Sequence, residues 1–236
     1  CDYARGGTVV YTRSRVQERA GRADVAEAAA YGVDPLEWWD ADRTHAAGAT
    51  GAVFDPNCAR VHPAKLVRGL ARALEARGVR IVEGTTATRV DPGRVTTDRG
   101  DVTCDRVVIA IEGYGAALPQ THRRILPLYS LMIATEPLPT AFWDEVGIPH
   151  GRTFSDYRHL LIYGQRTADD RFAFGGRGAR YHWGSDIRAD YDRVERVFAH
   201  LRRALGELFP AMGDAAVTHR WGGPLGVPRD WHAAVR

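Results

Sequence analysis

The stretch that decides the fold is VHPAKLVRGLARALEARGVRIVEGTTATRVDPGRVTTDRGDVTCDRVVIAIEG, residues 61–113. It predicts a helix over residues 62–77, because His62 stands at the N-cap position and Pro63 opens the first turn. Gly78 follows the last turn, where a helix commonly ends. The helix carries a leucine at every fourth position, which makes one apolar stripe: Leu66, Leu70 and Leu74.

Short strands are predicted after this helix, at residues 79–82, 86–90, 95–97 and 102–104. Pro92 and Gly93 suit the second and third positions of a β-turn between two of them. Residues 106–111 predict a buried strand, because four apolar residues run in succession. This order of elements is typical of the middle of a dinucleotide-binding domain, although the G-x-G-x-x-G fingerprint is absent from the chain.

The rest of the chain predicts more strands than helices. The expected strands are at residues 8–11, 125–135, 159–163 and 172–176, the last two joined by a polar loop at 164–169. A helix rich in Arg, Glu and Ala is expected after the strand at residues 8–11, and a short helix opening at residues 34–37 is expected to carry Trp38 and Trp39. Residues 189–209 predict a long amphipathic helix. We therefore expect a mixed α/β (α+β) fold of two intermixed units, with a boundary near residues 117–124.

Composition and charge exclude several classes of function. The net charge is +3, and the 32 basic residues, of which Lys65 is the one lysine, are scattered among 29 acids rather than gathered in the basic stripe of a nucleic-acid binder. No apolar run approaches the roughly 20 residues of a membrane span. Three widely spaced cysteines favour neither disulfides nor a metal site, so a cytoplasmic protein without metal is expected.

The two ends of the chain predict an internal fragment. It begins at Cys1 without methionine, and it ends at Arg236 shortly after a Gly/Pro-rich loop. That loop, Trp221 to Pro228, is open to two interpretations: a surface turn, or a backbone that passes close to a cofactor.

The glycines at 175–178 do not predict a phosphate-binding loop, because no helix follows them. Glycines in a strand beside aromatic residues more often permit close approach of a flat group, or mark a bulge. His62 is interpreted as a helix cap rather than a base or ligand. The motifs GxSxG, HxxxH and CxxC are absent, so hydrolase and zinc chemistry have no support in the sequence.

A series of short motifs recurs in order along nearly the whole chain. They are Gly51-Ala52, Val61-His62-Pro63-Ala64-Lys65-Leu66, Gly69-Leu70-Ala71, Gly78-Val79, Glu83-Gly84-Thr85, Val107-Val108-Ile109-Ala110, Gly113-Tyr114, Leu126-Pro127-Leu128-Tyr129-Ser130-Leu131-Met132, Thr135-Glu136-Pro137-Leu138, Phe174-Gly175-Gly176-Arg177-Gly178 and Arg220-Trp221-Gly222-Gly223-Pro224. In this order the chain resembles the FAD-dependent amine oxidases of the D-amino-acid oxidase and glycine oxidase family, in particular its gamma-glutamylputrescine oxidase-like branch.

The resemblance implies an incomplete FAD-binding domain of the glutathione-reductase-like type together with a substrate domain built on an antiparallel sheet. Residues 1–50 would be the helical part of the substrate domain, and residues 52–124 the middle segment of the FAD domain. Residues 125–220 would form the substrate-domain sheet with its covering helix, and residues 221–236 would return toward the FAD domain. The glycine loop for the pyrophosphate would lie upstream of Cys1, so weak or no FAD retention is expected of these 236 residues alone.

The resemblance also implies residues for the cofactor and the substrate, while the catalytic residues stay unassigned. The residues expected to bind FAD are Ala87, Ala110, Glu112, Gly113, Trp221 and Gly223. The residues expected to line the substrate pocket are Tyr129, Met132, Tyr163, Phe174 and Arg177, of which Arg177 would anchor a remote carboxylate.

The implied reaction is hydride transfer from a C–H bond beside nitrogen to flavin N5, with O2 as the expected acceptor and a small amine or amino acid as substrate. Family members often carry an arginine shortly after Trp-x-Gly, but here Pro224 and Leu225 follow. That difference favours an amine without a carboxylate beside the reacting carbon. The alternatives are a dehydrogenase or demethylase that passes electrons to a partner, a non-catalytic fragment, and an Arg-rich binding module.

Overall fold

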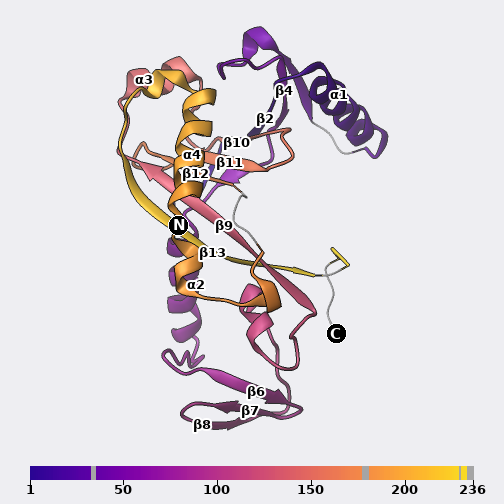
Figure 1. Cartoon of the computed structure of the whole chain (residues 1–236), viewed down its shortest axis with the longest axis vertical. Helices are drawn as coiled ribbons and strands as arrows, with labels where there is room; N and C mark the ends of the chain where they lie inside the picture. The colour runs from indigo at the N-terminus through magenta and orange to yellow at the C-terminus, as the bar shows by residue number, and fades with distance from the viewer. Residues whose placement is uncertain (33–35, 177–180, 229, 233–236) are drawn as a thin grey trace. The chain divides into compact units, whose positions relative to one another are not determined.

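The computed structural model describes residues 1–32, 36–176, 181–228 and 230–232 (Figure 1). The chain divides into two compact units, each built from separated segments. Unit 1 comprises Cys1–Gly69, Leu131–Arg177 and Glu195–Trp221. Unit 2 comprises Leu70–Ser130, Gly178–Val194 and Gly222–Arg236.

An eight-stranded mixed sheet runs in the order β13-β9-β12-β11-β10-β2-β4-β3. Its strands are β2 (Thr8–Thr12), β3 (Glu37–Asp40), β4 (Gly51–Asp55), β9 (Ile125–Thr135), β10 (Thr153–Asp156), β11 (Ile162–Arg166), β12 (Phe172–Gly176) and β13 (Val217–Pro228). The pair β2–β10 is parallel, whereas β9–β12, β10–β11, β11–β12, β2–β4 and β3–β4 are antiparallel. The expected mixed α/β fold with a largely antiparallel sheet is therefore confirmed.

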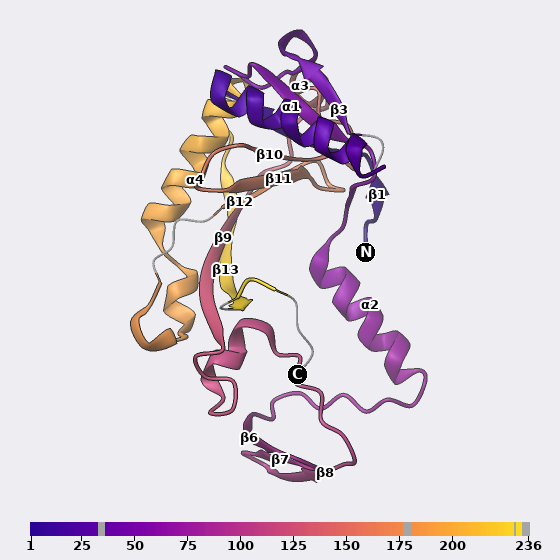
Figure 2. The same cartoon turned by 90° about the vertical axis from the view of Figure 1, so that its right-hand side faces the viewer.

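One face of the sheet in unit 1 forms the apolar core. Successive residues of a strand point to opposite faces, so Phe172 and Phe174 of β12 share this face with Ile133 of β9. These three side chains are fully buried. Helices α3 (Thr140–Val146) and α4 (Glu195–Leu208) supply partners: Trp143 and Phe142 meet the Phe172 ring edge-on, and α4 runs beside β12 (Figure 2).

The helix predicted over residues 189–209 begins later than expected. α4 starts at Glu195, and residues Ala189–Asp192 form a separate 3-10 turn. The predicted apolar stripe is otherwise confirmed, because α4 buries one continuous set of side chains: Val197, Phe198, Leu201, Leu205 and Leu208.

The short helix predicted to carry Trp38 and Trp39 is wrong. Both residues belong to β3, whose neighbour β4 pairs Trp38 with Val53 and Trp39 with Ala52. Trp39 is buried and stacks on Phe54 with ring centroids 4.5 Å apart. Aromatic residues favour strands when a neighbouring strand supplies hydrogen bonds, and that partner outweighed the local helix-start signal. Part of that signal, residues 33–35, lies outside the described residues.

Residues 221–228 are also more regular than expected, since they continue β13 rather than form a loop. Pro224 is compatible with this strand because β13 lies at the edge of the sheet. The predicted pair at 159–163 and 172–176 is observed as β11 and β12, with β11 shifted to begin at Ile162. Gly175 and Gly176 pair with both neighbours of β12, which confirms that they are strand residues.

The remaining elements largely follow the sequence. They are α1 (Arg15–Ala30), α2 (Pro63–Glu75), the meander β6 (Ala87–Asp91), β7 (Arg94–Thr97) and β8 (Gly100–Thr103), the short pair β1 (Ala4–Arg5) and β5 (Ala59–Arg60), and 3-10 turns at Ala41–Arg43, Glu112–Ala117, Ala189–Asp192, Trp183–Ser185 and Pro210–Met212. The Lys65 N–H points to His62 Nδ1 at 3.4 Å, and Gly78 takes a φ of +84°, as predicted for the two ends of α2.

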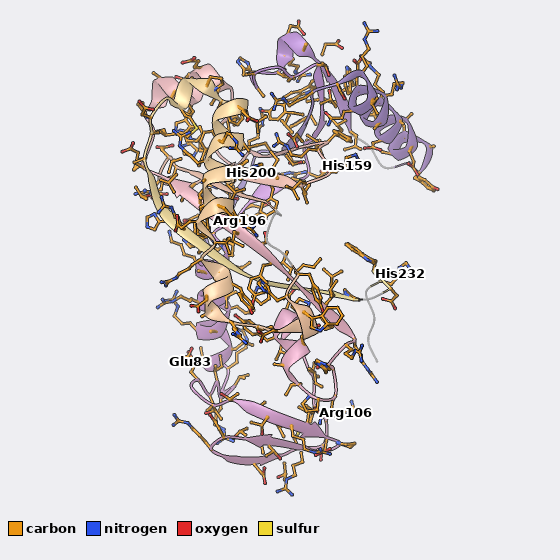
Figure 3. The ribbon with its side chains drawn as sticks, viewed as in Figure 1. Glu83, Arg106, His159, Arg196, His200 and His232 are labelled. Carbon is orange, nitrogen blue, oxygen red and sulfur yellow. The ribbon has the colours of Figure 1, made fainter. Side chains whose placement is uncertain are left out.

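Two predicted strands of unit 2, at residues 79–82 and 106–111, are wrong. Among the described residues neither segment has a neighbouring strand, and both expose their apolar side chains. Val108 is 86% exposed. Figure 3 labels Glu83, which directly follows the first segment, and Arg106, which begins the second. These segments have the apolar composition of a strand. They do not form one, because no neighbouring strand supplies hydrogen bonds to their backbone groups. In the described part of the chain, no helix is long and apolar enough to cross a membrane.

Candidate functional site

The second face of the sheet in unit 1 borders a cavity of about 970 Å³. Phe154 and Gly164, which belong to the core face, also border it. The other residues of this sheet that line the cavity alternate in sequence with the core residues, because strand side chains alternate between faces. They are Thr8, Met132, Ala134, Thr153, Ser155, Tyr163, Gln165, Ala173, His219 and Trp221. Six strands of one sheet therefore contribute side chains to this cavity.

A second wall comes from the segment that leads into α2. Arg60, Val61 and His62 line the cavity together with Lys65. This segment is tied down by backbone hydrogen bonds, because β5 pairs with β1 and the His62 N–H donates to the Cys1 carbonyl at 2.8 Å. Gln165 Nε2 joins it to the sheet by donating to the Val61 carbonyl at 3.2 Å.

Gly175 of β12 lies next to two residues of the cavity lining, Met132 and Tyr163. A Cβ placed on it would lie 2.7 Å from Met132 Cγ and 2.8 Å from Tyr163 Cε2. The missing side chain therefore lets these two residues lie over the strand. The sequence predicted that these glycines admit a flat group, and in unit 1 the Tyr163 ring is such a group.

Arg60 is the residue of this site that sequence reasoning missed. Only 6% of its surface is exposed, and its Nη1 donates to the Arg166 carbonyl at 3.3 Å. Its Nε has no hydrogen-bond partner among the described residues. Nothing in the sequence distinguishes Arg60 from the many other arginines, because its burial follows from the pairing of β5 with β1.

Other charged residues of the lining are held by partners inside the protein. Asp169 accepts hydrogen bonds from the Thr167 hydroxyl and from Arg171 Nε, each at 2.7 Å. These two bonds, the Thr167 bond first, lower the pKa of Asp169. Lys65 Nζ lies 2.7 Å from Asp2 Oδ2, and this pair is partly exposed.

The structure brings together two of the five residues predicted for the substrate pocket, Met132 and Tyr163. Phe174 lies on the opposite face, in the core, with its ring centroid 6.0 Å from that of Phe154. Tyr129 is buried in unit 2, where the Arg188 N–H donates to its hydroxyl at 3.2 Å, and burial raises its pKa. Arg177 lies outside the described residues.

The residues predicted to bind FAD fall in several places. Trp221 lines the cavity of unit 1 and is 42% exposed. In unit 2, Ala87 is exposed at the start of β6 and Ala110 is exposed in an irregular segment. Gly223 lies in β13, and no atom lies within 4 Å of a Cβ placed on it.

Glu112 and Gly113 make a compact contact with β13 inside unit 2. The Glu112 carboxylate accepts hydrogen bonds from the Gly226 N–H at 2.7 Å and from the Gly113 N–H. A Cβ on Gly113 would lie 2.9 Å from the Pro224 carbonyl oxygen, so the two backbones approach as closely as glycine allows. The carboxylate of Glu112 is thus already engaged in holding this contact.

Metal chemistry has no visible candidate in the part of the chain that the structure describes. There, no three side chains of His, Cys, Asp or Glu gather closely enough to hold an ion.

One protein family and several curated proteins match nearly the whole length of this chain. The family model described as DAO, FAD dependent oxidoreductase, matches residues 1–235. A probable oxidoreductase, OrdL, of Rhizobium meliloti is 32% identical over 224 residues, which is 91% of this chain and 48% of that protein. The gamma-glutamylputrescine oxidoreductase of Escherichia coli is 30% identical over 235 residues, 94% of this chain and 52% of that protein. The chain spans about half the length of these curated relatives.

Solved structures match the fold at low identity. Glycine oxidase from Geobacillus kaustophilus superimposes with a TM-score of 0.83 at 16% identity, covering 99% of this chain and 62% of that one. L-proline dehydrogenase from P. horikoshii gives a TM-score of 0.79 at 13% identity, covering 99% and 64%. At these identities the matches show the fold.

Proposed function

Because the chain belongs to the DAO family of FAD-dependent oxidoreductases, we propose that it oxidises a C–N bond of a small amine or amino acid. FAD is the cofactor of this family. The observation that carries the proposal is the cavity of unit 1, which lies on one face of the eight-stranded sheet. Its volume of about 970 Å³ lies at the upper end of the usual range for small-molecule sites.

The described residues suit this cofactor and substrate. Trp221 and Tyr163 offer aromatic surface in the cavity, and β13 is open above Gly223. We propose that Trp221 and Gly223 contact FAD, and that Ala87 and Ala110, both exposed, meet its adenine end. Glu112 and Gly113 would act by fixing the backbone there, since the Glu112 carboxylate already accepts two N–H groups.

When bound, FAD supplies the hydride acceptor for the C–H bond beside the substrate nitrogen, with O2 as the proposed final oxidant. The side chains of this chain would position the substrate. Met132 and Tyr163 form an apolar wall that excludes water from an alkyl amine. No dedicated acid or base is required if the amine binds unprotonated, so the cavity's task is orientation.

The domain assignment follows from the same proposal. Residues 52–124 would include the FAD-domain segment, and residues 1–50 and 125–220 would build the substrate domain, with 221–236 returning toward the FAD domain. β4, at the start of the first range, pairs with β2 of unit 1 and so contributes to the sheet that carries the cavity.

A dehydrogenase on the same fold is the second candidate. A D-amino acid dehydrogenase of Methylobacterium nodulans is 30% identical over 170 residues, 67% of this chain and 38% of that protein. Such an enzyme would transfer its electrons to a partner rather than to O2. Release of peroxide during turnover separates the two candidates.

The visible spectrum of the protein, purified at its natural length, tests the proposal first. We expect the bands of bound flavin, and we expect them to bleach without oxygen on addition of one amine from a panel of gamma-glutamylputrescine, putrescine, sarcosine and glycine. Peroxide on readmission of air then identifies an oxidase. A colourless protein that takes up no added FAD would refute the proposal.

The two methionines of the chain test where the substrate binds. Met132 lines the cavity, whereas Met212 is buried elsewhere in unit 1. Met132→Ala should raise KM severalfold with little change in melting temperature. Met212→Ala should lower the free energy of unfolding by about 2–5 kcal/mol and leave KM unchanged. An unchanged KM in Met132→Ala would place the substrate outside this cavity.

A further inference from the structure

We propose that Arg60 binds a carboxylate group of the small-molecule substrate inside the cavity of unit 1. The identity of the ligand as the substrate rests on the proposed function, whereas the anion site itself does not. Arg60 is not among the residues for which the family resemblance implies a role.

The first observation is a buried charge without a counter-charge. Arg60 is 94% buried, and in the described part of the chain no acidic side chain forms an ion pair with it. A guanidinium has five N–H donors, of which one meets the Arg166 carbonyl at 3.3 Å. The buried Nε has no acceptor among the described residues. Burying such a group without partners is costly, so a ligand that supplies the acceptors would be strongly favoured.

The second observation is the contrast with other shielded arginines of unit 1. Arg166 is 7% exposed, and its Nη2 lies 2.6 Å from Asp170 Oδ1. Arg158 Nη2 lies 2.6 Å from Asp156 Oδ2, which is itself buried. Arg166 and Arg158 are thus each paired with an acid, whereas among the described residues no acid pairs with Arg60.

The third observation is the charge of the cavity lining. Its two acids are already neutralised, because Asp2 is paired with Lys65 and Asp169 with Arg171. Arg60 therefore leaves the cavity with an unmatched positive charge, and apolar residues such as Met132 line the same cavity. A carboxylate carried on a short alkyl chain matches this combination, since its two oxygens suit a guanidinium in bidentate geometry.

Titration calorimetry of the purified protein without added flavin tests the site, with glutarate as the probe and glutaramide as its uncharged analogue. Glutarate should bind, and glutaramide should bind at least tenfold more weakly. Arg60→Met should weaken glutarate binding about tenfold to a hundredfold, the usual contribution of a charge-assisted pair. Arg60→Lys should keep part of the affinity for glutarate, because lysine keeps the positive charge but lacks the two parallel N–H donors of the guanidinium.

Arg43→Met is the matched control. Arg43 is an exposed arginine of unit 1 that pairs with Glu37 at 3.3 Å and does not line the cavity. Its glutarate affinity should equal that of the parent. Equal glutarate affinity in Arg60→Met would overturn the proposal. Pyrophosphate binding through Arg60 more tightly than glutarate would overturn the carboxylate assignment, because it would point to a cofactor phosphate instead.

The melting temperature of Arg60→Met distinguishes a binding role of Arg60 from a structural role. A structural role would lower this temperature, whereas a binding role would not. Removing an unpaired buried charge should leave the melting temperature of Arg60→Met unchanged or raise it. A lower melting temperature in both Arg60→Met and Arg60→Lys would show that the guanidinium supports the fold, against the proposal. If the protein proves colourless but binds glutarate through Arg60, the proposed function fails and the anion site stands.

Discussion

The core face of the unit 1 sheet and the exposed segments of unit 2 carry the same kinds of residue in opposite surroundings. Phe172 and Ile133 are fully buried, whereas Val108 and Val82 are 86% and 71% exposed. The first pair lies in strands that have neighbours on both sides, and the second pair lies in segments with no strand neighbour among the described residues. Apolar composition therefore predicts which segments can be buried. Hydrogen bonding to neighbouring strands decides which of them are buried.

The contrast extends to backbone hydrogen bonds. In the sheet, each inner strand satisfies its N–H and C=O groups through two neighbours. In residues 79–82 and 106–111 those groups have no such ladder, although valine and isoleucine have high strand propensity. High strand propensity therefore does not form a strand when no partner strand lies beside the segment.

The largest expected effect is on the core face. Phe172→Ala should lower the free energy of unfolding by about 3–5 kcal/mol, because it removes a ring packed between Phe142, Trp143 and Phe209. Val108→Ala should change it by less than about 0.5 kcal/mol, as is usual at exposed sites. Urea-induced unfolding of both variants measures the difference. A loss in Val108→Ala as large as in Phe172→Ala would show that the 106–111 segment is buried in solution.

A smaller effect is expected from glycines. A Cβ at Gly164 would lie 2.7 Å from Phe154 Cε1, so Gly164→Ala should cost about 1–3 kcal/mol by overpacking the core face. Gly69→Ala is its counterpart in α2, which buries no residue, and nothing lies within 4 Å of the added methyl. It should stabilise by up to about 1 kcal/mol, because alanine is the better helix former. Thermal melts of both variants test this, and a gain at Gly164 would contradict the close packing.

The smallest effect concerns an acid in unit 2. Asp192 Oδ1 is buried without a partner among the described residues, and burial raises the pKa of Asp192. A raised folded-state pKa contributes stability below the unfolded pKa of about 3.9, and that contribution is lost as pH rises through the folded pKa. Asp192→Asn should therefore be more stable than the parent by about 1 kcal/mol at pH 7.

That difference should shrink as the pH falls, because a growing fraction of Asp192 is then protonated and neutral, as asparagine is at every pH. Melting temperatures at several pH values between 4 and 7 follow it. A pH-independent difference would attribute the gain to the amide's own hydrogen bonds.

A small part of the candidate site could be predicted from the sequence. Met132 and Tyr163 were predicted for the pocket, and both line the cavity, because alternation along β9 and β11 places them on one face. Phe174 was predicted with them, yet it obeys the same alternation in β12 and points into the core. Without the register between strands, the sequence does not tell which of two faces holds the cavity.

Local signals alone determined the elements whose stabilising contacts lie nearby in the chain. His62, Pro63 and Gly78 set the ends of α2, Gly93 turns the meander, and the apolar run of β9 runs from Ile125 to Thr135 as expected. The tertiary structure decided three other points: that Trp38 and Trp39 form a strand, that residues 106–111 do not, and that Arg60 is buried in a cavity. Each of these depends on a partner far away in the sequence, and the hydrogen bonds and burial that such a partner provides have no local signature.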